Sequence, residues 1–284
     1  MYRVLDGLTL LQQWLDDQPN EVQALNLRGN LYWQISAMGK AADDYRRVAE
    51  LDPRRREARE RLGIGLLETG RYDEALKDLQ QVRQWKPDDA DLEVQIARCH
   101  ERIGRPQQAE EILDAVFAKH PDYGPALRLR GQMLLQAGRP ADAENWLRRA
   151  VNAVPDDYQA SWSLYQAFEK QNKTAEAKDQ LAFAEDLKDR GVRLGEITTR
   201  EMTARPRDPA LRCELGGLLL KKGLNELGER WLLSALTLDP HYRPAHAALA
   251  EYYRKQGDAD KADAHRREAQ TSPSTSPTST SRDR

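Results

Sequence analysis

The chain has 284 residues, with 44 Lys and Arg against 46 Asp and Glu, so its net charge is −2. This length suits one or two domains, and the balanced charge gives no sign of a surface built for nucleic acid or for an acidic membrane. Charged residues make up 32% of the chain and aromatic residues 7%, so the chain can fold while it exposes a large hydrated surface.

No apolar run approaches the roughly 20 residues of a membrane span. The start of the chain, from Met1 to Pro19, carries acidic side chains in its apolar part and lacks a small-residue cleavage site, so it does not resemble a signal peptide. Cys99 and Cys213 belong to no CxxC pair and are expected to be free thiols, which favours a reducing compartment. We therefore expect a cytoplasmic protein.

Prolines divide the chain with a regular spacing of about 34 residues, a fixed period that is typical of helical solenoids. The one exception is the gap from Pro155 to Pro206, which is one and a half periods long. The prolines that define the period are Pro19, Pro53, Pro87, Pro121, Pro155, Pro206 and Pro240.

Residues 1–20 predict one helix that has no partner before it, a half-repeat. An end repeat is expected to turn a polar face outward, but this helix carries a wide apolar stripe. We therefore expect the stripe to be covered by residues upstream of this sequence, by another domain, or by self-association through this helix. The stripe is centred on Leu8, Leu11 and Leu15, with Val4, Leu5, Leu10 and Trp14 beside them.

Residues 21–187 predict five repeats of two helices each. In the fourth, Gly138 suits the end of the first helix, Pro140 the start of the second and Pro155 its end. One pair of helices cannot bury its apolar faces, whereas stacked pairs cover one another. Small residues recur at two positions where the helices must approach: Gly29, Gly63, Ala97, Gly131, Gly216 and Ala250 at the first, and Ala41, Ala75, Ala109, Ala143, Ala177, Gly228 and Ala262 at the second.

Residues 188–205 form an extra helical half-repeat. They either prolong the second helix of repeat five or stand alone after a kink near Gly191 and Gly195, and we favour one long, kinked helix. We expect this segment to interrupt the regular twist and to divide the stack. Residues 206–269 predict two more repeats. Residues 270–284 are rich in Ser, Thr and Pro and are expected to be disordered.

These positions resemble the tetratricopeptide repeat family over about residues 20–187 and 205–269. The resemblance implies an all-α, right-handed α-solenoid of stacked helix hairpins, with about 15 or 16 helices, that binds a partner in a concave groove. The family pattern is matched by Leu62, Gly63, Leu66, Ala75, Leu79, Val82 and Pro87, and again by Leu215, Gly216, Leu219, Gly228, Leu232, Ala235 and Pro240.

The sequence contains no set of residues that predicts catalysis. It has no GxxxxGK[ST], GxGxxG, HExxH or GxSxG motif, and its histidines are scattered. His246 occupies a position that is normally core, and most acidic residues at helix starts suit caps. We expect no catalytic residue, no metal site and no cofactor.

A polar stripe on the first helices is the candidate binding site. In tetratricopeptide proteins the equivalent stripe lines the concave groove, so the resemblance implies a peptide-binding site there. Arg side chains can fork onto carboxylates, amides can bond an extended backbone, and Trp is a common binding anchor. The alternative is an ordinary surface, with the Trp partly packed on the next repeat. The candidate residues are Val94, Arg98, Arg102, Arg128, Gln132, Trp162 and Gln166.

The favoured function is a non-catalytic scaffold that binds an extended, acidic peptide or protein segment. The pairing of Lys and Asn that would clamp a chaperone C-terminus is not matched, because Asn26 and Asn30 have no paired Lys. One alternative is the substrate-positioning or regulatory part of a larger enzyme or redox protein. RNA binding is disfavoured by the neutral charge and the Pro and Gly spacing.

Overall fold

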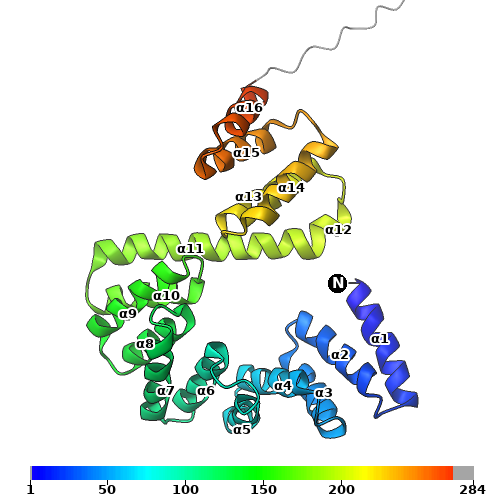
Figure 1. Cartoon of the computed structure of the whole chain (residues 1–284), viewed down its shortest axis with the longest axis vertical. Helices are drawn as coiled ribbons and strands as arrows, with labels where there is room; N and C mark the ends of the chain where they lie inside the picture. Colours follow the sequence, from blue (N-terminus) through cyan, green and yellow to red (C-terminus); the bar gives the residue numbers. More distant parts are fainter. Residues whose placement is uncertain (1, 271–284) are drawn as a thin grey trace, which may run out of the picture. The chain divides into compact units, whose positions relative to one another are not determined.

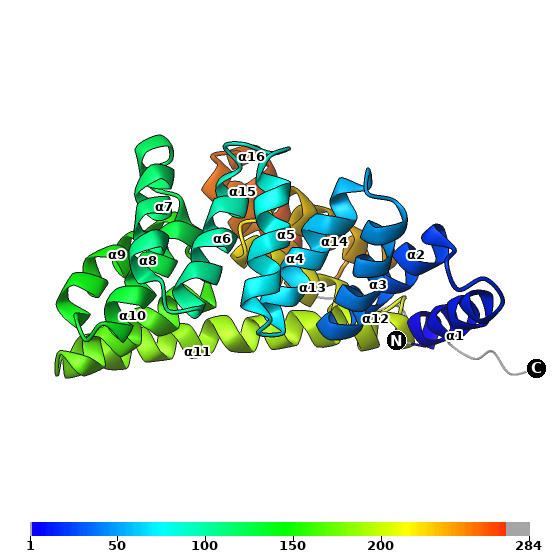
Figure 2. The same ribbon diagram turned by 90° about the horizontal axis from the view of Figure 1, so that it is seen from below.

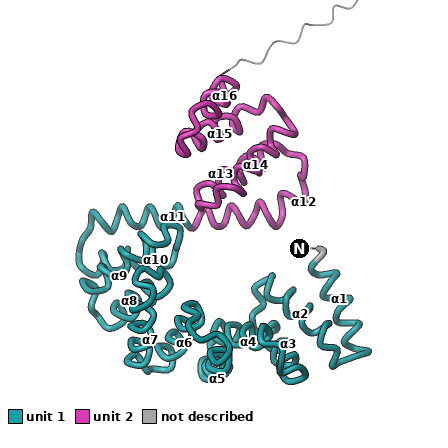
Figure 3. The backbone as a smooth tube through the Cα atoms, viewed as in Figure 1, with its two compact units in different colours: residues 1–187 teal, residues 188–284 magenta. Residues whose placement is uncertain are grey.

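The computed structural model describes residues 2–270, and the chain divides into two compact units, Met1–Leu187 and Lys188–Arg284 (Figure 3). Within the described residues the secondary structure is entirely helical. This confirms the all-α class and the stacked hairpins expected from the regular repeat period. None of the helices in residues 2–270 is both long enough and apolar enough to cross a membrane.

Unit 1 starts with the single helix α1 (Tyr2–Asp17) and continues as antiparallel hairpins, which Figures 1 and 2 show side by side in chain order. The hairpins are α2 (Val22–Gln34) with α3 (Met38–Leu51), α4 (Arg56–Glu68) with α5 (Tyr72–Arg83), α6 (Ala90–Arg102) with α7 (Pro106–Lys119), α8 (Gly124–Gln136) with α9 (Pro140–Ala153), and α10 (Tyr158–Lys170) with the first part of α11 (Thr174–Glu196).

Unit 2 contains the end of α11, an irregular segment and two further hairpins. These elements are the π-helical segment η1 (Ile197–Glu201), the short helix α12 (Met202–Ala204), the pair α13 (Pro209–Lys221) and α14 (Asn225–Leu238), and the pair α15 (Arg243–Gln256) and α16 (Ala259–Gln270).

The helices of the fourth repeat begin and end where the sequence predicts. Gly138 has a φ of +72°, a left-handed conformation that costs glycine little, and Pro140 occupies the first turn of α9. Acidic residues also cap the first helices of two other repeats, α6 and α10. Asp89 accepts a hydrogen bond from the backbone N–H of Leu92, and Asp157 accepts one from Ala160.

The recurring small residues allow the two helices of a hairpin to touch. A Cβ at Gly131 would lie 2.5 Å from Cγ of the fully buried Leu147. At Gly228, where the other repeats have Ala, a Cβ would lie 2.9 Å from the carbonyl oxygen of Gly216. Repeat six therefore needs glycine at this position, because a Cβ there would meet the backbone of the facing helix.

The extra half period continues α11 rather than forming a separate helix. Gly191 and Gly195 lie inside that helix, and the irregular backbone comes later, at η1. Ile197 is fully buried in a cluster with Leu211, Leu215 and Leu219 of α13. Arg193 strengthens the same junction, since its Nε lies 2.6 Å from Oε1 of Glu214. The change of twist expected from this segment stays a prediction.

Helix α1 corrects one expectation from the sequence. Leu15 is only 5% exposed and Leu11 packs on the same core cluster, because α2 covers this side of the helix. The expectation that another segment or a second copy covers the centre of this stripe is therefore wrong at Leu11 and Leu15, which the chain itself covers. The exposed apolar side chains of α1 are instead Leu5, Leu10 and Trp14. The expected disorder of the C-terminal tail concerns residues 271–284, which lie outside the described residues.

Candidate functional site

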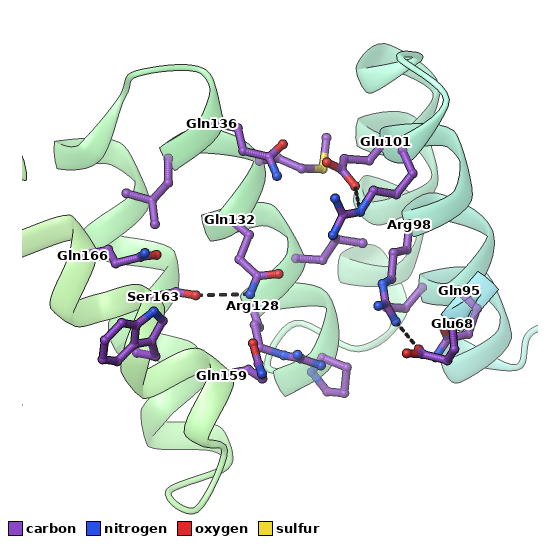
Figure 4. Close-up of a pocket in the computed structure, with 17 residues that line it drawn as sticks. Glu68, Gln95, Arg98, Glu101, Arg128, Gln132, Gln136, Gln159, Ser163 and Gln166 are labelled. Atoms are coloured by element: carbon purple, nitrogen blue, oxygen red, sulfur yellow. Dashed lines mark hydrogen bonds and ion pairs between the residues drawn. The ribbon is translucent and has the colours of Figure 1, made fainter. Parts of the chain in front are cut away.

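A polar pocket of about 510 Å³ lies along the first helices of repeats three to five in unit 1 (Figure 4). Helices α6, α8 and α10 line it, and Glu68 at the end of α4 closes one edge. All seven candidate residues line this pocket: Val94, Arg98 and Arg102 from α6, Arg128 and Gln132 from α8, and Trp162 and Gln166 from α10.

The repeat itself brings these side chains together. Arg98, Gln132 and Gln166 occupy the same position of three successive first helices, each one repeat period after the last, and Figure 4 shows each of them on a different helix. Consecutive first helices pack against one another, from α4 to α6, from α6 to α8 and from α8 to α10. A side chain at a given position therefore has its counterpart beside it in the next repeat.

Each arginine of the pocket has a carboxylate partner within the chain. Arg98 Nη1 lies 2.8 Å from Glu68 Oε1, and Arg102 Nε lies 3.3 Å from Glu101 Oε2.

Arg128 Nε lies 3.0 Å from Asp157 Oδ2, but its N–H does not point at this oxygen. The contact is therefore an ion pair without a hydrogen bond. Because Asp157 also caps α10, the same carboxylate holds both the helix start and the pocket arginine.

Amide side chains supply most of the remaining polar surface. Gln132 donates a hydrogen bond from Nε2 to the hydroxyl of the buried Ser163 at 3.1 Å. Gln95 Oε1 is buried and has no hydrogen-bond partner among the residues described. Two of the other pocket glutamines, Gln136 and Gln159, are exposed. Such groups can both donate to and accept from a peptide backbone.

Trp162 is half-buried and forms part of an aromatic row on α10. Its ring centroid lies 6.2 Å from that of Tyr158 and 5.1 Å from that of Tyr165, both on the same helix. These contacts hold the indole in place while one side borders the pocket. Both of these aromatic contacts come from its own helix.

Val94 is the least accessible of the candidate residues. It is 5% exposed and belongs to the core cluster with Ala97 and Leu113, so it contributes to the floor of the pocket. Sequence reasoning missed several lining residues, although the repeat offered a signal. Arg102 lies at the edge of the expected stripe, and Glu68 and Gln136 are its equivalents one repeat period before and after it.

The cysteines do not offer a reactive nucleophile at neutral pH. Burial raises the pKa of the Cys99 thiol to about 12 and that of Cys213 to about 11. Both thiols therefore stay protonated and weakly nucleophilic. Within residues 2–270 there is also no group of three or more His, Cys, Asp or Glu side chains placed to hold a metal ion.

Comparison with known protein families gives consistent matches along the chain. Profiles described as tetratricopeptide repeat match residues 66–133 and 104–168, residues 3–55 and 39–91, and residues 244–268. Tetratricopeptide repeat protein 37 of Xenopus laevis is 26% identical over 127 residues, which is 45% of this chain and 8% of that protein. The chain thus spans less than a tenth of the length of this relative.

Solved structures of low sequence identity are also similar to the chain. The MamA protein is 18% identical, with a TM-score of 0.45 over 60% of this chain and 93% of that one. A tetratricopeptide repeat protein from Parabacteroides merdae is 13% identical, with a TM-score of 0.45 over 87% and 91%. YrrB, described as having an unusual peptide-binding site, is 16% identical, with a TM-score of 0.40 over 62% and 91%.

Proposed function

Because the chain belongs to the tetratricopeptide repeat family, whose members bind protein partners, we propose that it is a non-catalytic scaffold that holds an extended peptide segment in the pocket of α6, α8 and α10. The observation that carries this proposal is the convergence of equivalent residues from three successive repeats on one pocket. A site that repeats along a solenoid suits a ligand that is itself extended along it.

The chemistry of the lining supports a polypeptide ligand. An extended strand presents alternating N–H and C=O groups, and the pocket offers the amides of Gln95, Gln132 and Gln166 to both. Trp162 offers a large, restrained apolar face for one side chain of the ligand. Ordering a flexible peptide offsets much of the contact energy, so we expect an affinity of roughly micromolar order, about −8 kcal/mol.

The carboxylates of the acidic partner favoured by the sequence would compete with carboxylates of the chain for the pocket arginines. Arg98 and Arg128 already face Glu68 and Asp157, so a ligand carboxylate would meet a like charge at each of these arginines. The alternative of a substrate-positioning part of a larger enzyme would use the same groove. Self-association through α1 would have to use Leu5, Leu10 and Trp14, and sedimentation velocity over a range of concentrations tests it.

The test is a selection of peptides that bind the full chain. A displayed library of random peptides of about 12 residues is suitable. In an extended conformation such a peptide is long enough to cross three neighbouring helices whose axes lie about 10 Å apart. Enriched peptides are then measured by calorimetric titration. Trp162→Ala is expected to weaken binding about 30-fold, equivalent to about 2 kcal/mol, and Gln132→Ala about fivefold.

Matched controls come from the same unit but lie outside the pocket. Trp14→Ala removes a 40% exposed Trp of α1, and Gln107→Ala removes an exposed amide of α7. Both are expected to bind as the wild type does. If the library yields no peptide whose binding depends on Trp162 or Gln132, the groove is not the site and the proposal fails.

A further inference from the structure

We infer that the segment held in this groove is close to neutral and presents an apolar side chain to Trp162, and that it is not acidic. The inference rests on the proposed function and specifies the chemistry of its ligand. It comes from the charges that surround the pocket in the folded chain, and it departs from the acidic segment expected from the arginines alone.

The charges of the pocket balance one another. Its lining includes three arginines and two glutamates, and Asp157 beside Arg128 supplies the third carboxylate. A ligand carboxylate that reached Arg98 would share the guanidinium with Glu68 and face it as a like charge. This repulsion offsets the attraction of the arginine, while the ligand would still lose its hydration.

A basic ligand meets the opposite difficulty. A Lys or Arg side chain that reached Glu68, Glu101 or Asp157 would face the arginine already paired there as a like charge. A pocket whose charges are already paired therefore selects against an excess of either sign. The groups left to bind a ligand are the uncharged ones.

These uncharged groups fit a peptide backbone and one apolar side chain. Gln136 and Gln159 carry exposed amides and Gln166 a half-buried one, all along the pocket. Their NH₂ and C=O groups can pair with a backbone C=O and a backbone N–H of the ligand. Trp162, fixed between Tyr158 and Tyr165, offers its face to Leu, Pro or an aromatic residue.

The selection with random peptides described above tests this inference directly. The expected result is a set of enriched peptides whose mean net charge is near zero and in which apolar residues are over-represented. In a matched pair, replacing two uncharged polar residues of an enriched peptide by Glu is expected to weaken binding at least about threefold. The affinity for the neutral peptide should change less than about twofold between low and high salt.

A variant with unpaired arginines provides the reciprocal experiment. Glu68→Gln with Asp157→Asn removes two carboxylates and retains a good cap for α10, because Asn is favoured at that position. This double variant is expected to favour the Glu-containing peptide over its neutral parent by about fivefold. Circular dichroism melting shows that the double variant is folded before binding is compared.

The outcomes separate the two proposals. If the wild-type chain selects acidic peptides, or if the double variant keeps the wild-type preference, the inference of a neutral ligand is wrong while the groove remains the site. If no selected peptide depends on Trp162 or Gln132, the groove proposal fails, and the inference about its ligand fails with it.

Discussion

His246 and His265 face each other in unit 2 with their Nδ1 atoms 2.9 Å apart. His246 Nε2 lies 2.9 Å from the carbonyl oxygen of Pro240, which can only accept, so this nitrogen carries a hydrogen. Neutral His246 therefore accepts at Nδ1, and His265 donates from its own Nδ1. This arrangement confirms that His246 is a core residue, since only 6% of it is exposed.

The surroundings of the pair oppose a positive charge. Burial lowers the pKa of His265, the neighbouring His246 lowers it further, and Glu268 acts in the opposite direction. Tyr253 stacks on His265 with ring centroids 5.6 Å apart, and its hydroxyl bonds Glu229. Lys261, placed over the Tyr253 ring, brings a further positive charge to the cluster.

Acid is therefore expected to destabilise the C-terminal hairpin. Because the pKa of His265 is lower in the folded chain than its ordinary 6.5, the unfolded chain binds a proton first as the pH falls. Stability is complete above about pH 6.5 and decreases below it. Melting temperatures measured by circular dichroism across this range should show the decrease.

Two variants test the origin of this pH dependence. His265→Phe keeps a ring on Tyr253 but removes the titrating group, so it should lose about 1 kcal/mol at neutral pH and flatten the decrease in acid. His241→Gln removes an exposed histidine of the same unit and should leave the decrease unchanged. An unaltered profile for His265→Phe would assign the pH dependence to other groups.

Glu144 is expected to be a second pH-dependent contact, at much lower pH. Burial alone would raise its pKa, but hydrogen bonds from Lys173, Gln171 and Arg148 lower it to about 2. The stabilisation is full above the ordinary pKa of 4.5 and is lost as the pH falls toward 2. Glu144→Gln should lower the free energy of unfolding by about 1–3 kcal/mol at neutral pH.

A nearby exposed carboxylate provides the comparison for Glu144. Asp142 lies on the same helix and pairs with Arg139 at the surface. Asp142→Asn should change stability by less than about 0.5 kcal/mol, because exposed ion pairs contribute little. Urea titrations of both variants measure the difference, and equal effects would contradict the role given to Glu144.

Replacing glycine by alanine should lower the stability of the fold at one position and raise it at another. Gly131→Ala forces Leu147 out of its packed position and should destabilise unit 1 by about 1–3 kcal/mol. Gly195→Ala meets open space inside α11 and should stabilise its helix by about 0.5–1 kcal/mol. Thermal melts distinguish these outcomes, and destabilisation by Gly195→Ala would indicate a conformation at this residue that only glycine adopts.

Charge reversal in the pocket should affect the fold as well as the ligand. Arg128→Glu places a negative charge beside Asp157, the cap of α10, so it should destabilise the chain by about 1 kcal/mol more than Arg128→Gln. Unfolding in urea at low and high salt measures the difference, which salt should reduce.

The sequence by itself determined the repeating architecture and the alignment of the groove. The regular spacing of Pro, Gly and Ala follows from the packing of each hairpin, so the positions equivalent to Arg98, Gln132 and Gln166 could be found by counting. The long helix α11 could also be predicted from the sequence, because residues 188–205 keep a helical pattern past the expected end of repeat five.

Only the tertiary structure decided which charged side chains form ion pairs with one another. Glu68 reaches Arg98 from the preceding repeat, and Asp157 reaches Arg128 from the start of the next first helix. Periodicity places each residue on a face of its own helix, but an ion pair depends on side chains that cross between helices. For the same reason the sequence did not reveal that α2 covers Leu15, or that His246 meets His265: each of these contacts exists only after neighbouring helices have packed.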